Sequence, residues 1–422
     1  MTYEPTLEFA RRLDEADPLR GFRERFALPR DRRGEPLVYL CGHSLGLMPL
    51  AARTLVLEEL EDWAQLAVLG HEHARRPWIP YHENLREGLA QLAGARSGEV
   101  VAMSSLTVNL HLLLAAFYLP SGERRRILIE AGAFSSDRHA VTSQMTWRGL
   151  DPEETLIELA PPAGADTIAE EAIEAYLEQH GATVALVLWP GVQFRTGQAF
   201  DLGRIARAAR RAGCLVGFDL AHAIGNMPLA LHEIGADFAV WCSYKYLNGG
   251  PGAIGGCFIH ERHDRPHLAG WWGHEAATRF RMGPGFQPAP GAAGWQISNP
   301  PILSAAPLIA SLALFAEASL PRLRQKSVAL TGYLQYLLER LGPDLELITP
   351  RAAQARGCQL SVRIAGPPGR GRRVFDALSA QGVIGDWREP DALRLAPVPL
   401  YNSFADVFRA ADALDEALRR ES

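Results

Sequence analysis

The stretch DFAVWCSYKYLNGGPG, residues 237–252, indicates both how this chain folds and where its chemistry lies. Its first six residues, DFAVWC, form an apolar run typical of a buried strand. After Ser243-Tyr244-Lys245 the chain breaks into glycines. A lysine normally seeks water, because a buried ammonium group is costly unless it is paired or used chemically. Lys245, where a strand ends and a glycine loop begins, is therefore a candidate functional residue.

Other short apolar runs share this character, and segments with helical periodicity separate them. Four of them predict buried strands: RILIE (126–130), TVALVLW (183–189), CLVGF (214–218) and AIGGCFI (253–259). Between the second and the third lies DLGRIARAARRAG, in which Asp201 suits a helix N-cap and Gly213 a helix stop. A strand, a helix and a strand at this spacing form a βαβ unit. We therefore expect an α/β fold, with a largely parallel or mixed sheet and helices on both faces.

The pattern changes after about residue 305. We expect helices over 303–320, 321–341, 371–381 and 403–420, and strands over 358–364, 383–387 and 392–396. These elements make a compact α+β unit, and the Pro/Gly-rich segment 282–295 is expected to be a loop. The chain then divides into an N-terminal segment 1–55 that packs with the small domain, a large domain 56–305 and a small C-terminal domain 306–422.

The composition is that of an ordinary soluble globular protein. Of 422 residues, 47% are hydrophobic and 22% charged, and the net charge of −5 does not favour nucleic acid or an anionic membrane as a partner. The N-terminus lacks an apolar signal core, and the apolar run 308–320 is too short to span a bilayer. Five cysteines without paired spacing (Cys41, Cys214, Cys242, Cys257, Cys358) argue against disulfides or a zinc site. We expect a cytoplasmic protein without a metal.

Two of the predicted strands end in reactive side chains. CLVGF is followed by Asp219 and then His222, and DFAVWC by Tyr244 and Lys245. Ligands of α/β sheets bind beyond the carboxyl ends of the strands. Pyridoxal phosphate (PLP) would use such a set, because a lysine forms its Schiff base and a carboxylate keeps its pyridine nitrogen protonated. Alone, an Asp after a strand is usually a cap and a strand-end lysine a solvated edge residue, but together they favour the cofactor.

A phosphate site is also needed. In SSLTVNLHLLLAAF (104–117), Ser and Thr come just before an apolar helical run, and helix N-termini bind anions through free N–H groups. A plain helix cap explains the same residues equally well in isolation.

Ten stretches together resemble the kynureninase family of fold-type-I PLP enzymes, in the family's order over nearly the whole chain. They are GHSLGLMP (42–49), GHEHARRPWI (70–79), SLTVNLHLLL (105–114), AFSSDRHA (133–140), GVQFRTGQ (191–198), VGFDLAHAIGN (216–226), WCSYKYLNGGPG (241–252), GWWGHE (270–275), WQISNPPI (295–302) and LRLAPVPLYNSF (393–404). The resemblance implies a large PLP-binding domain, whose mostly parallel, seven-stranded-type sheet is flanked by helices, and a smaller α+β domain.

The resemblance also implies a role for each matching cofactor residue. Lys245 would form the Schiff base, Asp219 would hold the pyridinium, and Phe134 would stack on the pyridine ring. The remaining cofactor positions are Leu106, Thr107, Ser135, Ser136, Asp137, His222, Tyr244, Trp271 and Asn299. In the family the last two come from the neighbouring subunit, which implies a homodimer with shared active sites.

Substrate positions follow in the same way. Arg394 matches the arginine that binds the substrate carboxylate, and four further residues match substrate positions, mostly near the aryl group: Ser44, His71, Ser298 and Asn299. Two residues depart from the family pattern. His43 stands where asparagine is usual, and Pro190 stands where serine is frequent, so a side-chain contact to the cofactor is lost there.

The implied activity is hydrolysis of L-kynurenine, or of its 3-hydroxy form, to an anthranilate and L-alanine in tryptophan catabolism. Lys245, Tyr244 and Asp219 would be catalytic, with Tyr244 a proton donor or relay whose pKa a cationic neighbour lowers. One alternative is another fold-type-I lyase, such as a cysteine desulfurase-like enzyme, although no cysteine lies in an obvious loop near the site. The other is a non-catalytic homologue that binds PLP.

Overall fold

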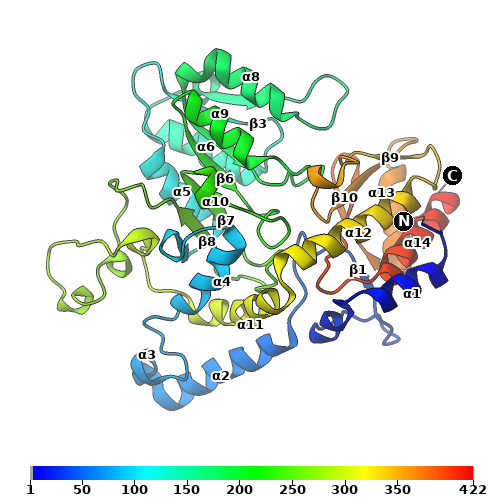
Figure 1. Cartoon of the computed structure of the whole chain (residues 1–422), viewed down its shortest axis with the longest axis horizontal. Coiled ribbons are helices and arrows are strands. Elements are labelled where there is room, and N and C mark those ends of the chain that lie inside the picture. Colours follow the sequence, from blue (N-terminus) through cyan, green and yellow to red (C-terminus); the bar gives the residue numbers. More distant parts are fainter. Residues whose placement is uncertain (1–2, 422) are drawn as a thin grey trace.

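A seven-stranded sheet forms the centre of the larger part of the molecule (Figure 1). The computed structural model describes residues 3–421. Across the sheet the strands are β2 (Val100–Ala102), β8 (Gly256–Ile259), β7 (Phe238–Trp241), β6 (Leu215–Asp219), β5 (Val184–Pro190), β3 (Arg126–Glu130) and β4 (Leu156–Leu159). β8 runs antiparallel to both of its neighbours, and the other neighbouring pairs are parallel. The predicted mostly parallel sheet is confirmed.

Helices cover both faces of this sheet, which explains why its strands are apolar throughout. Successive side chains of a strand point to opposite faces. In β5, Val187 and Trp189 join the core beneath one set of helices: α4 (Glu83–Ala93), α8 (Glu170–His180), α9 (Leu202–Arg211) and α11 (Ile302–Ala318). Leu186 and Leu188 join a second core beneath α5 (Leu106–Phe117) and α6 (Ser135–Trp147). A strand buried on both faces shows no polar alternation.

The βαβ unit read from the sequence is present. The Asp201 carboxylate accepts a hydrogen bond of 2.9 Å from the backbone N–H of Arg204 and so caps α9. Gly213 follows the helix with a φ of 72°, a conformation that suits glycine. The chain then enters β6, which runs parallel to β5.

The smaller part of the molecule contains an antiparallel sheet and both ends of the chain (Figure 1). Its strands, in spatial order, are β12 (Asp386–Arg388), β13 (Ala392–Leu395), β10 (Leu360–Ile364) and β9 (Leu345–Leu347). Its helices are α12 (Leu320–Leu338), α13 (Arg370–Ala380), α14 (Phe404–Arg420) and, from the N-terminus, α1 (Leu7–Ala16), which packs against α14. β1 (Val38–Tyr39) pairs with β11 (Val383–Ile384). The domain limits at residues 55 and 305 stay a prediction.

The remaining elements are short or lie outside the two sheets. They are α2 (Leu50–Leu66), α3 (Gly70–His73), α7 (Pro152–Thr155), α10 (Leu231–Ile234) and the 3₁₀ helices η1 (Arg20–Arg25), η2 (Ala67–Leu69), η3 (Ser97–Glu99), η4 (Gly181–Thr183), η5 (Trp271–Gly273), η6 (Arg279–Arg281), η7 (Gly291–Trp295) and η8 (Ala353–Ala355). α2 packs on α11 and forms the lower edge of the molecule in Figure 1.

Three expectations about local structure differ from what is observed. The one strand expected over 383–387 forms two short strands, β11 and β12, which belong to different sheets. The segment 282–295 is not wholly a loop, because it ends in η7, where Trp295 is buried and stacks on Phe117. The strand expected over 253–259 begins only at Gly256. β1, β2, β4 and β9 were not expected, and β1 has only two residues. β2 and β9 have three residues each, too few to show a period, and β4 is a partly exposed edge strand.

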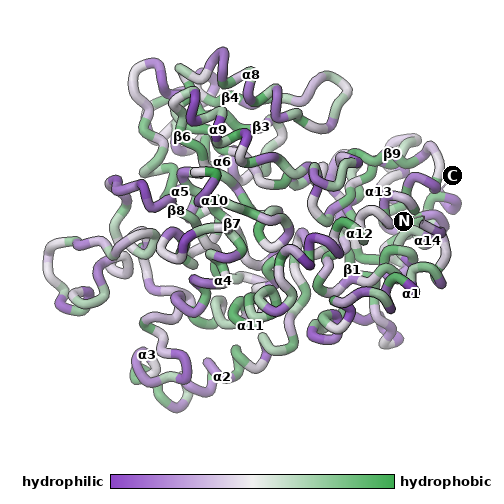
Figure 2. Tube along the Cα trace, in the orientation of Figure 1, coloured by the Kyte–Doolittle hydropathy of each residue, from purple (hydrophilic) through white to green (hydrophobic). Residues whose placement is uncertain are grey.

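Hydrophobic residues gather in the central sheet and along α11 (Figure 2). Within residues 3–421, no single helix is both long and apolar enough to cross a membrane. α11 and α12 meet such a criterion only as a pair, by length and composition, and they are bent by 82° relative to each other.

Candidate active site

Three strands deliver reactive groups to one edge of the central sheet. β3 ends at Glu130, β6 ends at Asp219, and the chain reaches Lys245 shortly after β7. Because these strands are parallel, their carboxyl ends meet at the same edge. The chain leaves β3 toward β4 but leaves β5 toward β6, on the opposite side, so the strand order reverses between β3 and β5. Such a reversal opens a crevice for a ligand.

This crevice is a cavity that contains most of the residues predicted for the cofactor. Nine of the twelve line it: Leu106, Thr107, Phe134, Ser136, Asp137, Asp219, His222, Tyr244 and Lys245. Pro190, one of the two departures from the family pattern, lines it as well. Ser135 is exposed at the start of α6 and is not part of the lining. The convergence of acid, imidazole, phenol and amine expected from the strand ends is therefore observed.

The amine of Lys245 contacts a neutral imidazole. Its Nζ lies 3.0 Å from Nε2 of His222. Burial, followed by the charge of Lys245, lowers the pKa of His222 well below its ordinary value. The neutral ring can therefore accept a hydrogen bond from the ammonium group through Nε2. Its Nδ1 is buried and has no hydrogen-bond partner among the described residues.

Three carboxyl groups meet at the floor of the cleft. Asp219 accepts a hydrogen bond of 2.7 Å from the backbone N–H of Ala221. Burial, followed by the charge of Asp219, raises the pKa of Asp137 well above its ordinary value. Burial also raises the pKa of Glu130 to about 8. Near neutral pH, Asp137 and Glu130 are therefore protonated, because like charges in a buried site cannot all ionise.

Glu130 was missed from the sequence, although a signal for it existed. It ends the run RILIE just as Asp219 follows the run CLVGF. The rule that singled out Asp219 applies equally to Glu130. Its buried side chain lines the cleft.

Two helices begin at the side of the cleft. The Thr107 hydroxyl of α5 and the Ser136 hydroxyl of α6 lie 2.7 Å apart. The N-cap residue of α5, Ser105, makes no side-chain capping hydrogen bond. Free backbone N–H groups at two adjacent helix N-termini favour an anion there. A phosphate at this place stays a prediction.

An aromatic wall closes one side of the cleft. The Phe134 ring is 41% exposed, and its centroid lies 5.8 Å from Nζ of Lys245. Phe194 meets it edge to face, with ring centroids 5.4 Å apart. A flat ring placed beside Lys245 would find an aromatic surface to stack on.

The prediction for the pKa of Tyr244 is wrong. Burial raises this pKa above its ordinary value, and Cys242 and Asp219 act in the same direction. Lys245 was expected to lower it, but its ammonium lies 6.0 Å from the centroid of the phenol ring. Tyr244 is therefore protonated at neutral pH and can donate a proton, but it is not a base at rest.

Arg394 lies buried behind the wall of the cleft. Its Nε donates a hydrogen bond of 2.7 Å to Oδ2 of Asp386, and its Nη1 donates one of 2.6 Å to the carbonyl of Phe194. Asp386 is its cross-strand partner in the pairing of β12 with β13. Asp386 was also missed from the sequence, because the register that places opposite charges face to face cannot be read from one strand alone.

Three of the residues predicted for the substrate or cofactor lie elsewhere. His71, Trp271 and Asn299 line a second cavity near the surface, together with Trp78 and Phe280. Two other predicted substrate residues line neither cavity. Ser298 is exposed, and Ser44 is half-buried, with its backbone N–H donating to the carbonyl of Cys41 at 2.9 Å. Within one chain, the predicted site is thus divided between two places.

Comparison with known proteins identifies relatives over nearly the full length. Residues 323–414 match the family model of the kynureninase C-terminal domain. The chain is 56% identical to the kynureninase of Xanthomonas campestris pv. campestris strain B100 over 419 residues, which are 98% of this chain and 99% of that protein. It is 57% identical to the kynureninase of Xanthomonas euvesicatoria pv. vesicatoria strain 85-10, over 94% of each chain.

Solved structures share the fold at much lower identity. The cysteine desulfurase CsdA from Escherichia coli has a TM-score of 0.76 at 19% identity and covers 95% of this chain and 98% of its own. A mutant of C-DES with glycine covalently linked to the PLP cofactor has a TM-score of 0.75 at 18% identity, covering 91% and 96%. These likenesses support the predicted fold class alone, whereas the identity to the Xanthomonas proteins extends over the whole chain. The chain belongs to the kynureninase family.

Proposed function

We propose that this protein is a PLP-dependent hydrolase that converts L-kynurenine, and 3-hydroxy-L-kynurenine, to the corresponding anthranilate and L-alanine in tryptophan catabolism. The observation that carries the proposal is the convergence of Lys245, His222 and Asp219 in one cleft of a chain that belongs to this family. The reaction adds one water across the bond between the β and γ carbons of the substrate.

The residues of the cleft suit PLP. Lys245 offers an amine for the aldehyde, and Asp219 offers a carboxylate for the pyridine nitrogen. Two buried polar atoms, Oδ1 of Asp137 and Nδ1 of His222, have no partner among the described residues, as expected of a site shaped for a polar ligand. The N-termini of α5 and α6 suit its phosphate. When bound, PLP supplies a ring that accepts electrons from the substrate.

The side chains divide the work of moving protons. Lys245 Nζ takes the α-proton of the bound substrate and returns a proton at a later step, while Nε2 of His222, 3.0 Å away, orients it. Asp219 lines the cleft and offers its carboxylate to keep the pyridine nitrogen protonated, while the neutral Asp137 and Glu130 add no further negative charge beside it. Tyr244, protonated at rest, donates a proton toward the departing side of the substrate.

Arg394 binds the α-carboxylate of the substrate. All three of its nitrogens donate hydrogen bonds, Nε and Nη2 to Asp386 and Nη1 to the carbonyl of Phe194, so the planar guanidinium is held in one orientation. One N–H on each terminal nitrogen remains free for a carboxylate.

The enzyme acts as a homodimer with shared sites, in which Trp271 and Asn299 of one chain, with His71 in the same cavity, complete the cleft of the other. The second cavity supports this proposal. Beside it, Val68 is 73% exposed, Phe280 56% and Trp271 46%. Exposed apolar groups gathered in one patch are typical of a surface that another chain covers. The enzyme acts in the cytoplasm on a small molecule and needs neither nucleic acid nor a membrane.

A desulfurase activity is disfavoured by the cysteines. All five are free and buried, and a desulfurase needs a thiolate that reaches the substrate. Burial also raises the pKa of Cys242, the cysteine three residues before Lys245.

The test is direct. Purified protein is incubated with PLP and L-kynurenine while the fluorescence of anthranilate is followed, and 3-hydroxy-L-kynurenine is assayed by absorbance. Wild type should turn over both, and Lys245→Ala neither. Borohydride reduction followed by peptide mapping should place the cofactor on Lys245. Absence of anthranilate from the wild-type protein, or a label on another lysine, would contradict the proposal.

A further inference from the structure

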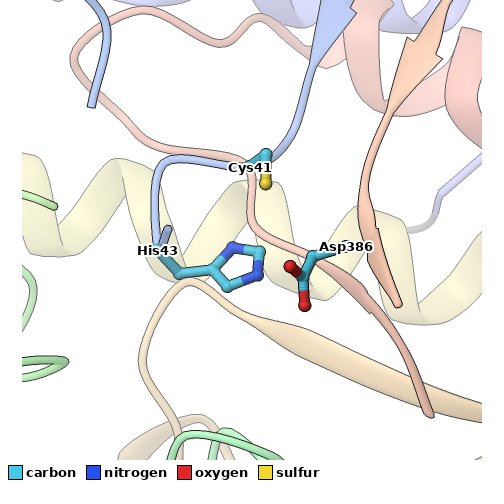
Figure 3. A group of neighbouring side chains, drawn as sticks. All are labelled: Cys41, His43 and Asp386. Atoms are coloured by element: carbon cyan, nitrogen blue, oxygen red, sulfur yellow. The ribbon is translucent and has the colours of Figure 1, made fainter. Parts of the chain in front are cut away.

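Next to Arg394 lies a small cluster of polar side chains that the proposed mechanism does not use. Cys41, His43 and Asp386 each direct a possible ligand atom toward the others, and these atoms all lie within 4.8 Å of one another. Figure 3 shows the His43 ring pointing toward the Asp386 carboxylate, with the Cys41 sulfur nearby. His43 is the residue that departs from the family's usual asparagine.

The surroundings of the cluster oppose a metal cation. The Asp386 carboxylate is already ion-paired with Arg394 and with Arg388, whose Nε lies 2.9 Å from Oδ2. A divalent cation at Asp386 would stand beside two guanidinium groups and would compete with both. The same donor set therefore does not favour zinc, although its residue types would suit it.

Positive charge is in excess at this place. Lys245, Arg388 and Arg394 all act on the His43 ring, whereas Asp386 is the acidic partner of both arginines. An uncompensated cationic group inside a protein attracts an anion. The charge of the site thus suits a carboxylate.

His43 lacks the hydrogen bonds that a buried imidazole normally makes. The side chain is 1% exposed, and neither ring nitrogen has a partner among residues 3–421. An unpaired buried polar group typically costs about 1–3 kcal/mol. Such a group beside an excess of positive charge is therefore expected to find its partner in a bound ligand.

We propose that His43 is a further substrate-binding residue, whose ring N–H donates a hydrogen bond to the α-carboxylate that Arg394 holds. This inference rests on the proposed function. A carboxylate accepts up to about four hydrogen bonds, and Arg394 retains two N–H groups for it. A neutral imidazole adds a donor without adding a further charge beside the guanidinium groups of Arg388 and Arg394. Asparagine, usual at this position in the family, also offers an N–H.

The test separates the carboxylate from the rest of the substrate. KM for L-kynurenine and the inhibition constant of its decarboxylated amine analogue are measured for wild type, His43→Ala and His43→Asn holoenzymes. His43→Ala should raise KM about tenfold and change kcat by less than about twofold, because a bond to a charged group is lost in substrate and transition state alike. The inhibition constant of the amine should not change. His43→Asn should stay within about threefold of wild type, because its amide replaces the donor.

Cys41→Ser is the matched control, because it alters the same cluster without changing the proposed donor. Its KM should equal that of wild type. An unchanged KM in His43→Ala overturns the proposal, and so does an equal loss for the kynurenine and amine ligands, since a merely structural role would weaken both. If the wild-type protein fails to hydrolyse kynurenine, the proposed function and this inference fall together; with wild-type turnover, the His43 result alone decides.

Discussion

The cleft at the carboxyl edge of the central sheet and the second cavity beside η5 differ in how completely one chain builds them. In the cleft, Asp219 and His222 are 8% and 6% exposed, and each has a hydrogen-bond partner in the same chain. In the second cavity, Trp271 is 46% exposed and Asn299 is at the surface. At the edge of a parallel sheet a single chain can build a site, because the carboxyl ends of neighbouring strands lie side by side. A surface cavity needs a partner before its apolar lining is covered.

The largest effect is expected at the floor of the cleft. Asp219→Ala should lower kcat about 100- to 1000-fold while PLP still binds, because the carboxylate that keeps the pyridine nitrogen protonated is lost. Steady-state kinetics and the absorbance of bound cofactor measure the two quantities. Asp412→Ala, at an exposed aspartate of α14 outside the cleft lining, is the control and should be nearly neutral. Near-normal turnover by Asp219→Ala would remove the basis for the proposed role of this residue.

The second prediction tests whether the second cavity of one chain completes the cleft of the other chain in a dimer. Lys245→Ala damages the cleft, and Asn299→Ala damages the second cavity, so neither protein alone should be active. If the cavity of one chain completes the cleft of the other, a hybrid dimer keeps one intact site. An equal, fully exchanged mixture should then recover about a quarter of wild-type activity, since half of the dimers are hybrids.

Exchange has to be verified, for example by native mass spectrometry of differently tagged chains. A mixture of Lys245→Ala with Asp219→Ala is the control, because both changes damage the cleft and no hybrid site is intact. Confirmed hybrids without recovered activity would show that each site is built from a single chain.

A smaller effect is expected at Arg394, which lies behind the wall of the cleft. Arg394→Lys should raise KM for kynurenine at least about tenfold with a lesser change in kcat, because an ammonium group cannot bind a carboxylate through two parallel hydrogen bonds. Arg388→Lys is the matched control: Arg388 pairs with the same Asp386, but its side chain is 39% exposed. Equal KM values for the two variants would contradict the proposed carboxylate site.

The elements that the sequence predicts correctly share one property: their signals are local. The runs 126–130 and 214–218, the cap at Asp201 and the helix over 403–420 are all visible in a few neighbouring residues, and each is observed within two residues. The residues of the cleft follow from strand ends and from family motifs.

What escapes the sequence depends on pairing between distant segments. Asp386 matters because β12 and β13 pair in one register, and the raised pKa of Tyr244 reflects burial that no motif records. The position of Trp271 and Asn299 in a separate cavity is also a tertiary fact. Charge in the sequence suggested a lowered pKa for Tyr244, but desolvation, which depends on the packed fold, outweighs it.

The smallest effect on catalysis is expected from Glu130→Gln. This variant tests the burial of the cleft through the pH dependence of the free energy of unfolding. The pKa of Glu130 is raised by burial from 4.5 to about 8 in the folded protein. Between these pH values the folded chain holds a proton that the unfolded chain has lost. The contribution of Glu130 to stability is therefore fully present below 4.5 and falls as the pH rises to about 8, above which it is constant.

Glutamine does not titrate, so the stability of Glu130→Gln relative to wild type should increase with pH. We compare the free energies of unfolding of the cofactor-free variant and of cofactor-free wild type. Between pH 6 and pH 8 their difference should change by up to about 2.7 kcal/mol in favour of the variant, as one pKa unit corresponds to about 1.36 kcal/mol. Denaturant unfolding at several pH values measures this. Glu72→Gln changes an exposed acid of the second cavity and is the matched control. Its free energy of unfolding should vary with pH as that of wild type does. If the Glu130→Gln and wild-type curves are also parallel, the carboxyl is solvated in solution, and the contrast between a closed cleft and an open cavity is smaller than the structure indicates.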